Sequence, residues 1–141
     1  MTVASNAVRV TAKVDPPWDT NAWRAAARAA LCAGLPPEQL DWSGGAQGSL
    51  LGGLDLSMLP ARRSAPRVPA EFLALAGAVL CHRAEDRHGL LYRLLWRIAE
   101  GERALLQRAS DPDVHRATTM AQAVRRDSHK MKAFVRFREV P

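Results

Sequence analysis

The chain has 141 residues, 48% of them hydrophobic and 24% charged, which suits one soluble globular domain with a buried core. Its 20 Lys and Arg outnumber its 14 Asp and Glu, and the net charge of +6 favours nucleic acid, an acidic protein or an anionic surface as partner. Two cysteines are too few for a disulfide framework or a zinc ribbon, no apolar run could span a membrane, and the N-terminus lacks the form of a signal peptide. We therefore expect a cytoplasmic protein that binds no membrane and holds no cofactor.

The first predicted elements are a strand and a helix. Residues 7–14 alternate Val or Ala with Arg, Thr or Lys, which is typical of a half-buried strand. A helix capped by Asp19 or Thr20 then runs to Gly34, and Trp18 is expected to pack against its start. Four residues mark the buried side of this helix: Trp23, Ala27, Ala30 and Leu31.

The middle of the chain gives weaker signals. Residues 36–40 predict a short helical turn, and residues 41–43 and 54–59 predict short strands. Residues 44–53 hold five of the nine glycines without the GK[ST] sequence of a phosphate-binding loop, so a flexible loop is favoured over a ligand cradle. The Gly-, Pro- and Arg-rich stretch of about 43–69 is accordingly predicted to be flexible loop and solvated basic linker.

Two apolar helices are predicted next. The first begins after Pro69, and its core stripe has five members: Phe72, Leu75, Ala76, Val79 and Leu80. The second runs from about Asp86 to Gln107, and its core side also has five: Leu91, Leu94, Leu95, Ile98 and Leu105. Tyr92 and Trp96 on a neighbouring stripe favour core packing over base stacking.

Several polar and sulfur-bearing residues of these helices receive structural interpretations. Arg93 and Arg97, one turn apart, are predicted to form a solvated face. Cys32 and Cys81 lie in apolar helical patterns and are predicted to be buried thiols. Cys81 with His82, Asp86 and His88 is the cluster most similar to a metal site, but its spacing matches no common zinc pattern.

The last segment begins as a helix and is predicted to end as a strand. Ser110 or Asp111 can cap the helix, with Pro112 in its first turn. Apolar and small residues recur at steps of three and four: Val114, Ala117, Ala121, Val124, Ser128 and Met131. From Phe134 the residues alternate, so the helix is expected to give way to a strand near Ala133.

This segment also carries the excess charge. Between Val114 and Arg138 there are seven Lys or Arg and one acid, Asp127, and seven minus one equals the +6 of the whole chain. The candidate nucleic-acid-binding residues are Arg125, Arg126, His129, Lys130, Lys132, Arg136 and Arg138. Such a row could contact several backbone phosphates, which positions a protein without reading sequence. The alternative is that Arg125 and Arg136 pair with Asp127, Asp113 or Glu139 and leave a mildly basic surface.

Together these elements predict a single α+β domain in which a small β-sheet packs against about four main helices. No nucleophile with a base, pair of catalytic acids or metal set is evident, so the chain is predicted to be non-catalytic.

Three blocks of sequence resemble a known family. They are YRLLW at 92–96, DPDV at 111–114, and the block from Ala123 to Val140, which contains VRRD, HKM and FVRFR. They are similar to the bacterial "probable DNA metabolism protein" family, and the resemblance extends over nearly the whole chain. Members occur alone beside a radical-SAM DNA-repair protein, or N-terminal to a UdgX-type uracil-DNA glycosylase in fusion proteins. The family pattern continues past Pro141, so residues 1–141 are expected to form the N-terminal part of a longer family domain.

The resemblance implies a role in DNA repair or DNA metabolism. The chain lacks the Gly-Glu-x-Pro-Gly motif, cluster cysteines and reactive His loop of the glycosylase, so no glycosylase activity is expected of it. The expected function is a non-catalytic, DNA-binding accessory domain that contacts the phosphates of double- or single-stranded DNA, independently of sequence, through residues 114–138. The alternative is a protein-interaction module that docks a uracil-DNA glycosylase or a radical-SAM repair partner.

Overall fold

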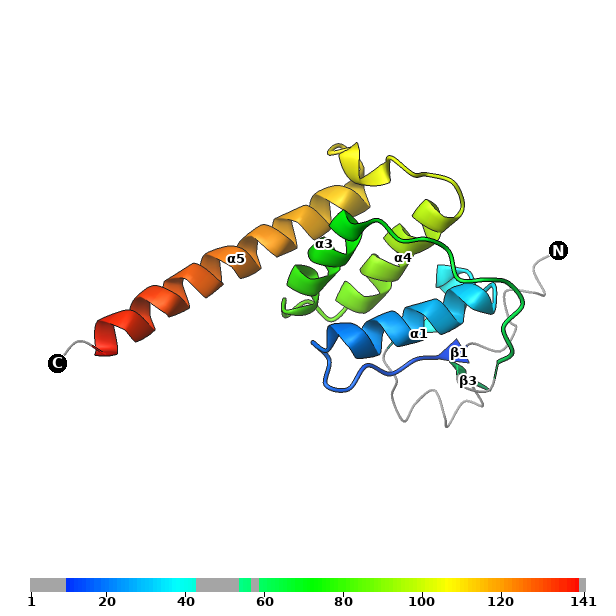
Figure 1. Cartoon of the computed structure of the whole chain (residues 1–141), viewed down its shortest axis with the longest axis horizontal. Coiled ribbons are helices and arrows are strands. Elements are labelled where there is room, and N and C mark those ends of the chain that lie inside the picture. Colours follow the sequence, from blue (N-terminus) through cyan, green and yellow to red (C-terminus); the bar gives the residue numbers. More distant parts are fainter. Residues whose placement is uncertain (1–9, 43–53, 57–58, 140–141) are drawn as a thin grey trace.

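A computed structural model describes residues 10–42, 54–56 and 59–139, and the side chains of 10–42, 56 and 59–128 within them. The predicted glycine-rich loop at 44–53 lies outside the described residues. The elements in chain order are β1 (Val10–Thr11), α1 (Thr20–Cys32), the 3-10 helix η2 (Pro37–Gln39), β2 (Leu40–Asp41), β3 (Leu54–Asp55), α3 (Ala70–Leu80), α4 (Arg87–Ala99), the 3-10 helix η4 (Leu105–Gln107) and α5 (Pro112–Glu139). The prediction of a small α+β domain is confirmed, with four α-helices in the described part of the chain (Figure 1).

The sheet is small and parallel, with β1 between β2 and β3. Val10 pairs with Leu40 on one side and with Leu54 on the other. Three alternating residues are buried: Val10, Ala12 and Val14. Lys13 between them is exposed, so the predicted half-buried alternation is confirmed from residue 10 onward. Residues 7–9 lie outside the described part.

Helix α1 forms as its sequence predicts. Asp19 caps it by accepting a hydrogen bond at Oδ1 from the backbone N–H of Ala22 at 3.0 Å. The four predicted core residues are all buried. Gly34 lies just past the helix end with φ of 74°, a conformation that glycine adopts without strain. The expectation for Trp18 is wrong, because 61% of this residue is exposed.

The segment after β3 is not a merely solvated linker. The backbone N–H groups of Arg62 and Arg63 both donate to the carbonyl of Cys32, at 2.7 and 3.0 Å. The Arg63 side chain donates to the carbonyl of Leu31 at 2.7 Å and lies over the ring of Trp96 at 5.1 Å. This segment therefore satisfies the free carbonyls at the end of α1.

Helices α3 and α4 form the centre of the core. Most of their predicted core residues are buried, and Tyr92 donates a 2.6 Å hydrogen bond to the carbonyl of Leu35 from a fully buried position. The prediction of one helix from Asp86 to Gln107 is wrong. Helix α4 ends at Ala99, and Gly101 takes φ of 123°, which redirects the chain. Leu105 still reaches the core from η4.

The predicted burial of the two cysteines is also wrong. Cys32 is partly exposed, and Cys81 is exposed at the end of α3. Both thiols are free. In the part of the chain that the structure describes, no helix has the length and apolar character needed to cross a membrane.

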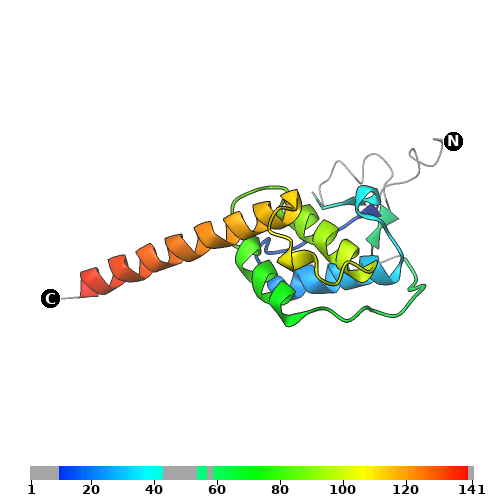
Figure 2. The ribbon, with the colours of Figure 1, turned by 90° about the horizontal axis from the view of Figure 1, so that it is seen from above.

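Helix α5 begins packed and ends outside the body of the molecule. Asp111 caps it, accepting at Oδ1 from the backbone N–H groups of Asp113 and Val114 at 2.9 and 3.3 Å. Four residues of its first three turns are buried: Val114, Ala117, Met120 and Ala121. Beyond them the helix extends away from α3 and α4, and its far end lies opposite the sheet (Figures 1 and 2).

The predicted strand after Ala133 is wrong, because α5 continues as a helix to Glu139. A strand needs a neighbour to pair its backbone groups, and the described sheet lies at the other end of the molecule (Figure 1). A helix satisfies its backbone hydrogen bonds internally, so it can extend without a neighbour.

Candidate nucleic-acid interface

The candidate interface is the part of α5 that extends beyond the body. The whole helix has 28 residues and is therefore about 42 Å long at 1.5 Å per residue. Ala121 is the last buried residue of α5 among the described side chains, and the helix then extends away from α3 and α4 (Figures 1 and 2). We call residues 122–139 the distal half of α5.

The distal half is strongly basic. It contains six Lys or Arg against two acids, Asp127 and Glu139. All seven candidate binding residues lie in it, on one continuous helix. The sequence interpretation divided them between a helix and a strand, so the continuous helix changes their arrangement.

Helical geometry brings four of these positions to one side. Positions 125, 129, 132 and 136 follow one another at steps of four, three and four, which recur along one face of an α-helix. The first and last of them are 11 positions apart, or about 16 Å along the helix axis. We call Arg125, His129, Lys132 and Arg136 the basic row.

The other candidate positions do not all join this row. Arg126 and Lys130 are one turn apart and form a neighbouring pair of positions. Arg138 follows Arg136 by two residues, which places it on nearly the opposite side of the helix. The structure thus brings six of the seven candidates onto two adjacent sides.

The side chains of Arg125 and Arg126 are exposed, as is that of Asp127. Neither arginine forms an ion pair with the side chains that the structure describes. The alternative that Arg125 pairs with Asp113 is not met, because Asp113 binds Arg93 at 3.1 Å and lies 3.9 Å from Arg97. Both arginines are therefore available to an outside anion.

Arginines in the body contrast with these two. Arg97 donates to Glu102 at 2.8 Å and to Asp111 at 2.7 Å, so the predicted solvated face at Arg93 and Arg97 is wrong. Hydrogen bonding to Arg97 lowers the pKa of Asp111 and keeps this capping residue charged. These ion pairs fix the start of α5 to the end of α4, and we call them the first tie between the two helices.

A second tie lies at the other end of α4. Arg116 on α5 forms a two-pronged ion pair with Asp86, the residue before α4. Hydrogen bonding to Arg116 lowers the pKa of Asp86. Sequence reasoning missed both ties, since the partners lie 14 or more residues apart and nothing in the local pattern signals them.

The metal-like cluster is not assembled. His88 is buried and donates from Nε2 to the carbonyl of Pro17 at 2.8 Å, while His82 accepts at Nδ1 from the backbone N–H of Ala84 at 3.0 Å. Cys81 faces solvent. Among the described residues, no three His, Cys, Asp or Glu side chains gather as metal ligands would.

Residues 85–141 match the model of a family described as a domain of unknown function, DUF4130. No curated protein and no solved structure matches the chain. The matched segment takes in α4, η4 and α5, and so contains both ties and the whole candidate interface. Residues 85–141 of this chain are thus similar to that family.

Proposed function

We propose that the chain is a non-catalytic accessory domain of a DNA-repair or DNA-metabolism protein, and that it holds the phosphate backbone of DNA with the distal half of α5. The observation that carries this proposal is the basic row on a helix that extends beyond the body, with Arg125 exposed and without an acidic partner in the described structure. The role in repair rests on the resemblance of the sequence blocks, and the mode of binding rests on the helix.

The geometry of the row suits a backbone rather than a single ion. Its positions span about 16 Å, and duplex DNA carries a phosphate charge for roughly every 1.7 Å of its axis. Three to five phosphate contacts from this surface give a log–log salt slope of roughly −3 to −4.5 on duplex DNA. Contacts of this kind ignore base sequence.

The proposal is tested by fluorescence anisotropy with a short labelled duplex and a labelled single strand between about 50 and 200 mM salt. Arg125→Ala/Arg126→Ala/Lys130→Ala should abolish binding at the upper salt concentration and flatten the salt slope. The matched control is Arg67→Ala/Arg83→Ala/Arg103→Ala, which removes the same charge from three exposed arginines of the body. Circular dichroism should be the same for all three proteins.

Equal losses in the two triple variants would mean that net charge, and not the distal half of α5, binds DNA. Absence of binding by the unchanged protein at low salt would rule out the backbone-binding function.

A docking module is the second candidate, and one observation favours it. The buried stripe of α5 continues into the distal half at positions 124, 131 and 135, which hold Val, Met and Val and follow the last buried residue of the described part, Ala121. A helix with an apolar stripe beside a basic row suits an acidic groove of a uracil-DNA glycosylase or a radical-SAM partner. Met131→Ser, which removes the apolar side chain without changing the charge, should then weaken binding of the partner, measured by calorimetry, and leave any DNA affinity nearly unchanged.

A further inference from the structure

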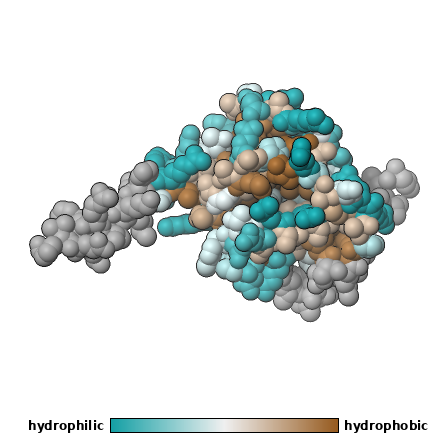
Figure 3. Space-filling model, in the orientation of Figure 1, coloured by the Kyte–Doolittle hydropathy of each residue, from teal (hydrophilic) through white to brown (hydrophobic). Residues whose placement is uncertain are grey.

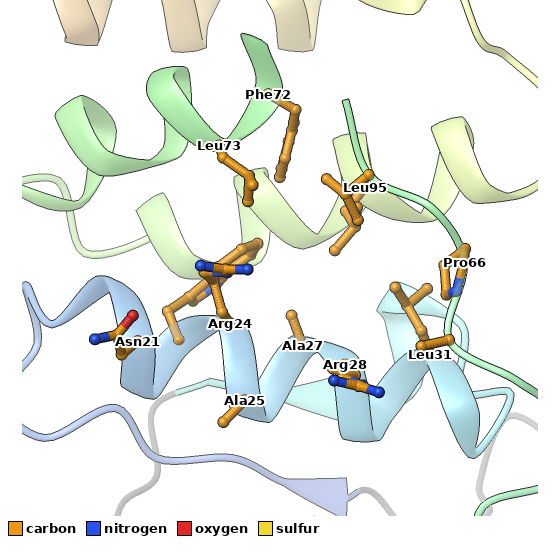
Figure 4. Close-up of a pocket in the computed structure, with 13 residues that line it drawn as sticks. Asn21, Arg24, Ala25, Ala27, Arg28, Leu31, Pro66, Phe72, Leu73 and Leu95 are labelled. Carbon is orange, nitrogen blue, oxygen red and sulfur yellow. The ribbon is translucent and has the colours of Figure 1, made fainter. Parts of the chain in front are cut away.

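A cavity of about 510 Å³ opens between α1, α3 and the segment that precedes α3. Its size falls within the range of small-molecule sites in proteins. Figure 4 shows Phe72 and Leu73 extending from α3 toward α1, and Leu95 reaching in from α4 behind them. Pro66 borders it at the side. We call it the α1–α3 cavity.

The floor of this cavity is formed by residues of the hydrophobic core. Four of its lining residues belong to the hydrophobic core and expose 4% of their surface or less: Trp23, Leu31, Phe72 and Leu95. The space-filling view shows hydrophobic residues reaching the surface in the middle of the face seen in Figure 1, between hydrophilic neighbours (Figure 3). The apolar surface that a ligand could cover is provided by the partly buried members of the lining, Pro66, Val68 and Leu73.

The rim of the cavity is positively charged. Arg24 and Arg28 lie one turn apart on α1, and both are exposed. The described residues of the lining include no Asp or Glu, and neither arginine has an ion-pair partner among the described side chains. Asn21, one turn before them, adds an uncharged polar group.

The second cavity of similar size shows what distinguishes this one. It also measures about 510 Å³ and is lined by two arginines, Arg93 and Arg97. Those arginines are already bound by the acids of the tie between α4 and α5, and Glu38 adds a negative charge to the lining. Only the α1–α3 cavity, of these two, combines an apolar floor with cations that have no partner.

We propose that the α1–α3 cavity binds a small amphipathic anion, with its apolar body on the floor and its carboxylate, sulfonate or phosphate between Arg24 and Arg28. The charge at the rim and the apolar floor each select one half of such a ligand. Guanidinium forks hold these anionic groups in two-pronged hydrogen bonds, which orients the ligand with its apolar end inward. This site is on a different element from the distal half of α5, so it stands or falls independently of DNA binding.

The probe for the test is 8-anilinonaphthalene-1-sulfonate, an aromatic sulfonate whose fluorescence rises on burial. We expect saturable binding at one site per chain. Arg24→Ala/Arg28→Ala should raise the Kd by roughly tenfold or more, since it removes charge-assisted hydrogen bonds. Leu73→Glu should have a similar effect by placing a negative charge in the lining.

The matched control is Arg83→Ala/Arg103→Ala, which removes the same charge from exposed arginines outside the cavity. Substitutions at such surface positions have small effects, so the Kd of the control should stay within about twofold of that of the unchanged protein. Thermal unfolding of each variant confirms that the probe meets a folded protein. Probe binding that does not saturate would overturn the proposal. So would a Kd that rises by the same factor in the control and in the Arg24/Arg28 variant.

Competition identifies the source of the ligand. Displacement of the probe by dodecanoate supports an aliphatic carboxylate, and displacement by adenosine monophosphate supports a nucleotide. Inorganic phosphate alone should compete far more weakly than either, because it has no apolar body. If phosphate competes as well as both, the cavity is a plain anion site and the proposal is wrong.

Discussion

Arg97 on α4 donates a 2.7 Å hydrogen bond to Oδ2 of Asp111, while Oδ1 of the same carboxylate caps the start of α5. One side chain therefore both begins the long helix and fixes it to the core. Asp111→Ala should lower the free energy of unfolding by about 1 kcal/mol for the lost cap. Asp111→Asn keeps a capping oxygen but loses the charge that faces Arg97, so it should be less costly than Ala. Urea unfolding of both variants measures the order, and the reverse order would contradict the double role of Asp111.

Acid should weaken the ties between α4 and α5. Arg116 and Arg97 lower the pKa values of Asp86 and Asp111 in the folded protein, so these carboxylates stabilise the fold above their unfolded pKa near 3.9. That stability should be lost as the pH falls below about 4 through the lower folded values. Urea unfolding between pH 7 and pH 2 tests this. Asp86→Asn should start less stable at pH 7 and lose less on acidification, and an identical pH profile would contradict the tie.

His88 should give a separate pH dependence at milder acidity. Burial lowers its pKa below the ordinary 6.5, so the unfolded chain takes up a proton at a higher pH than the folded one. Stability should therefore fall as the pH drops below about 6.5, by up to about 1.4 kcal/mol per pH unit until the folded pKa is reached. His88→Gln removes the titrating group. Its unfolding free energy should change little across that window, and a loss as large as in the unchanged protein would assign the effect to another group.

The turn after α4 depends on Gly101. Its φ of 123° is a conformation that side chains rarely adopt, so Gly101→Ala should destabilise the fold by about 1–2 kcal/mol. Gly77→Ala is the matched control, because Gly77 lies inside α3 and a methyl group there would meet Thr20 Oγ1 at an ordinary 4.0 Å. That change should be neutral or stabilising by up to about 1 kcal/mol. Thermal unfolding compares the two, and equal effects would show that φ at residue 101 carries no constraint.

The packed part of α5 should end between Met120 and Val124. Met120 is buried, so Met120→Ala should cost about 2–4 kcal/mol. Val124 is only partly buried, and Val124→Ala should cost less than about 1 kcal/mol. Hydrogen exchange should likewise be slow at 117–121 and fast in the distal half. A large cost at Val124 would mean that the body covers more of α5 than the structure shows.

The sequence predicted those elements whose signals are local. Helix α1 has a capping Asp19, an apolar stripe and a stop at Gly34, and all three act within the helix itself. The basic character of the last segment needed only a count of charges. The first strand of the sheet was predicted correctly because the alternation at 10–14 reflects one buried and one exposed face.

The errors arose where a local pattern had two physical explanations. Leu105 continues the apolar spacing of α4 and so suggested one long helix. The chain in fact turns at Gly101, and η4 returns Leu105 to the core. The alternation after Phe134 suits a strand, but a strand needs a neighbour and the described sheet is distant. The ties of Arg97, and the cavity that Arg24 lines together with Phe72 and Leu73 of α3, depend on packing between helices, which no local pattern reveals.

The central position of β1 also sets the order in which the sheet can form during co-translational folding. Val10 pairs with Leu40 and Leu54, so the first strand to be made must wait for the synthesis of 30 and then 44 further residues. The contacts of α4 with α3 and with α5 join helices that follow one another in sequence, whereas the contacts between α3 and α5 must also wait until α4 has been made. The nascent chain therefore carries β1 without any partner until β2 has left the exit tunnel, and with one open edge until β3 has followed.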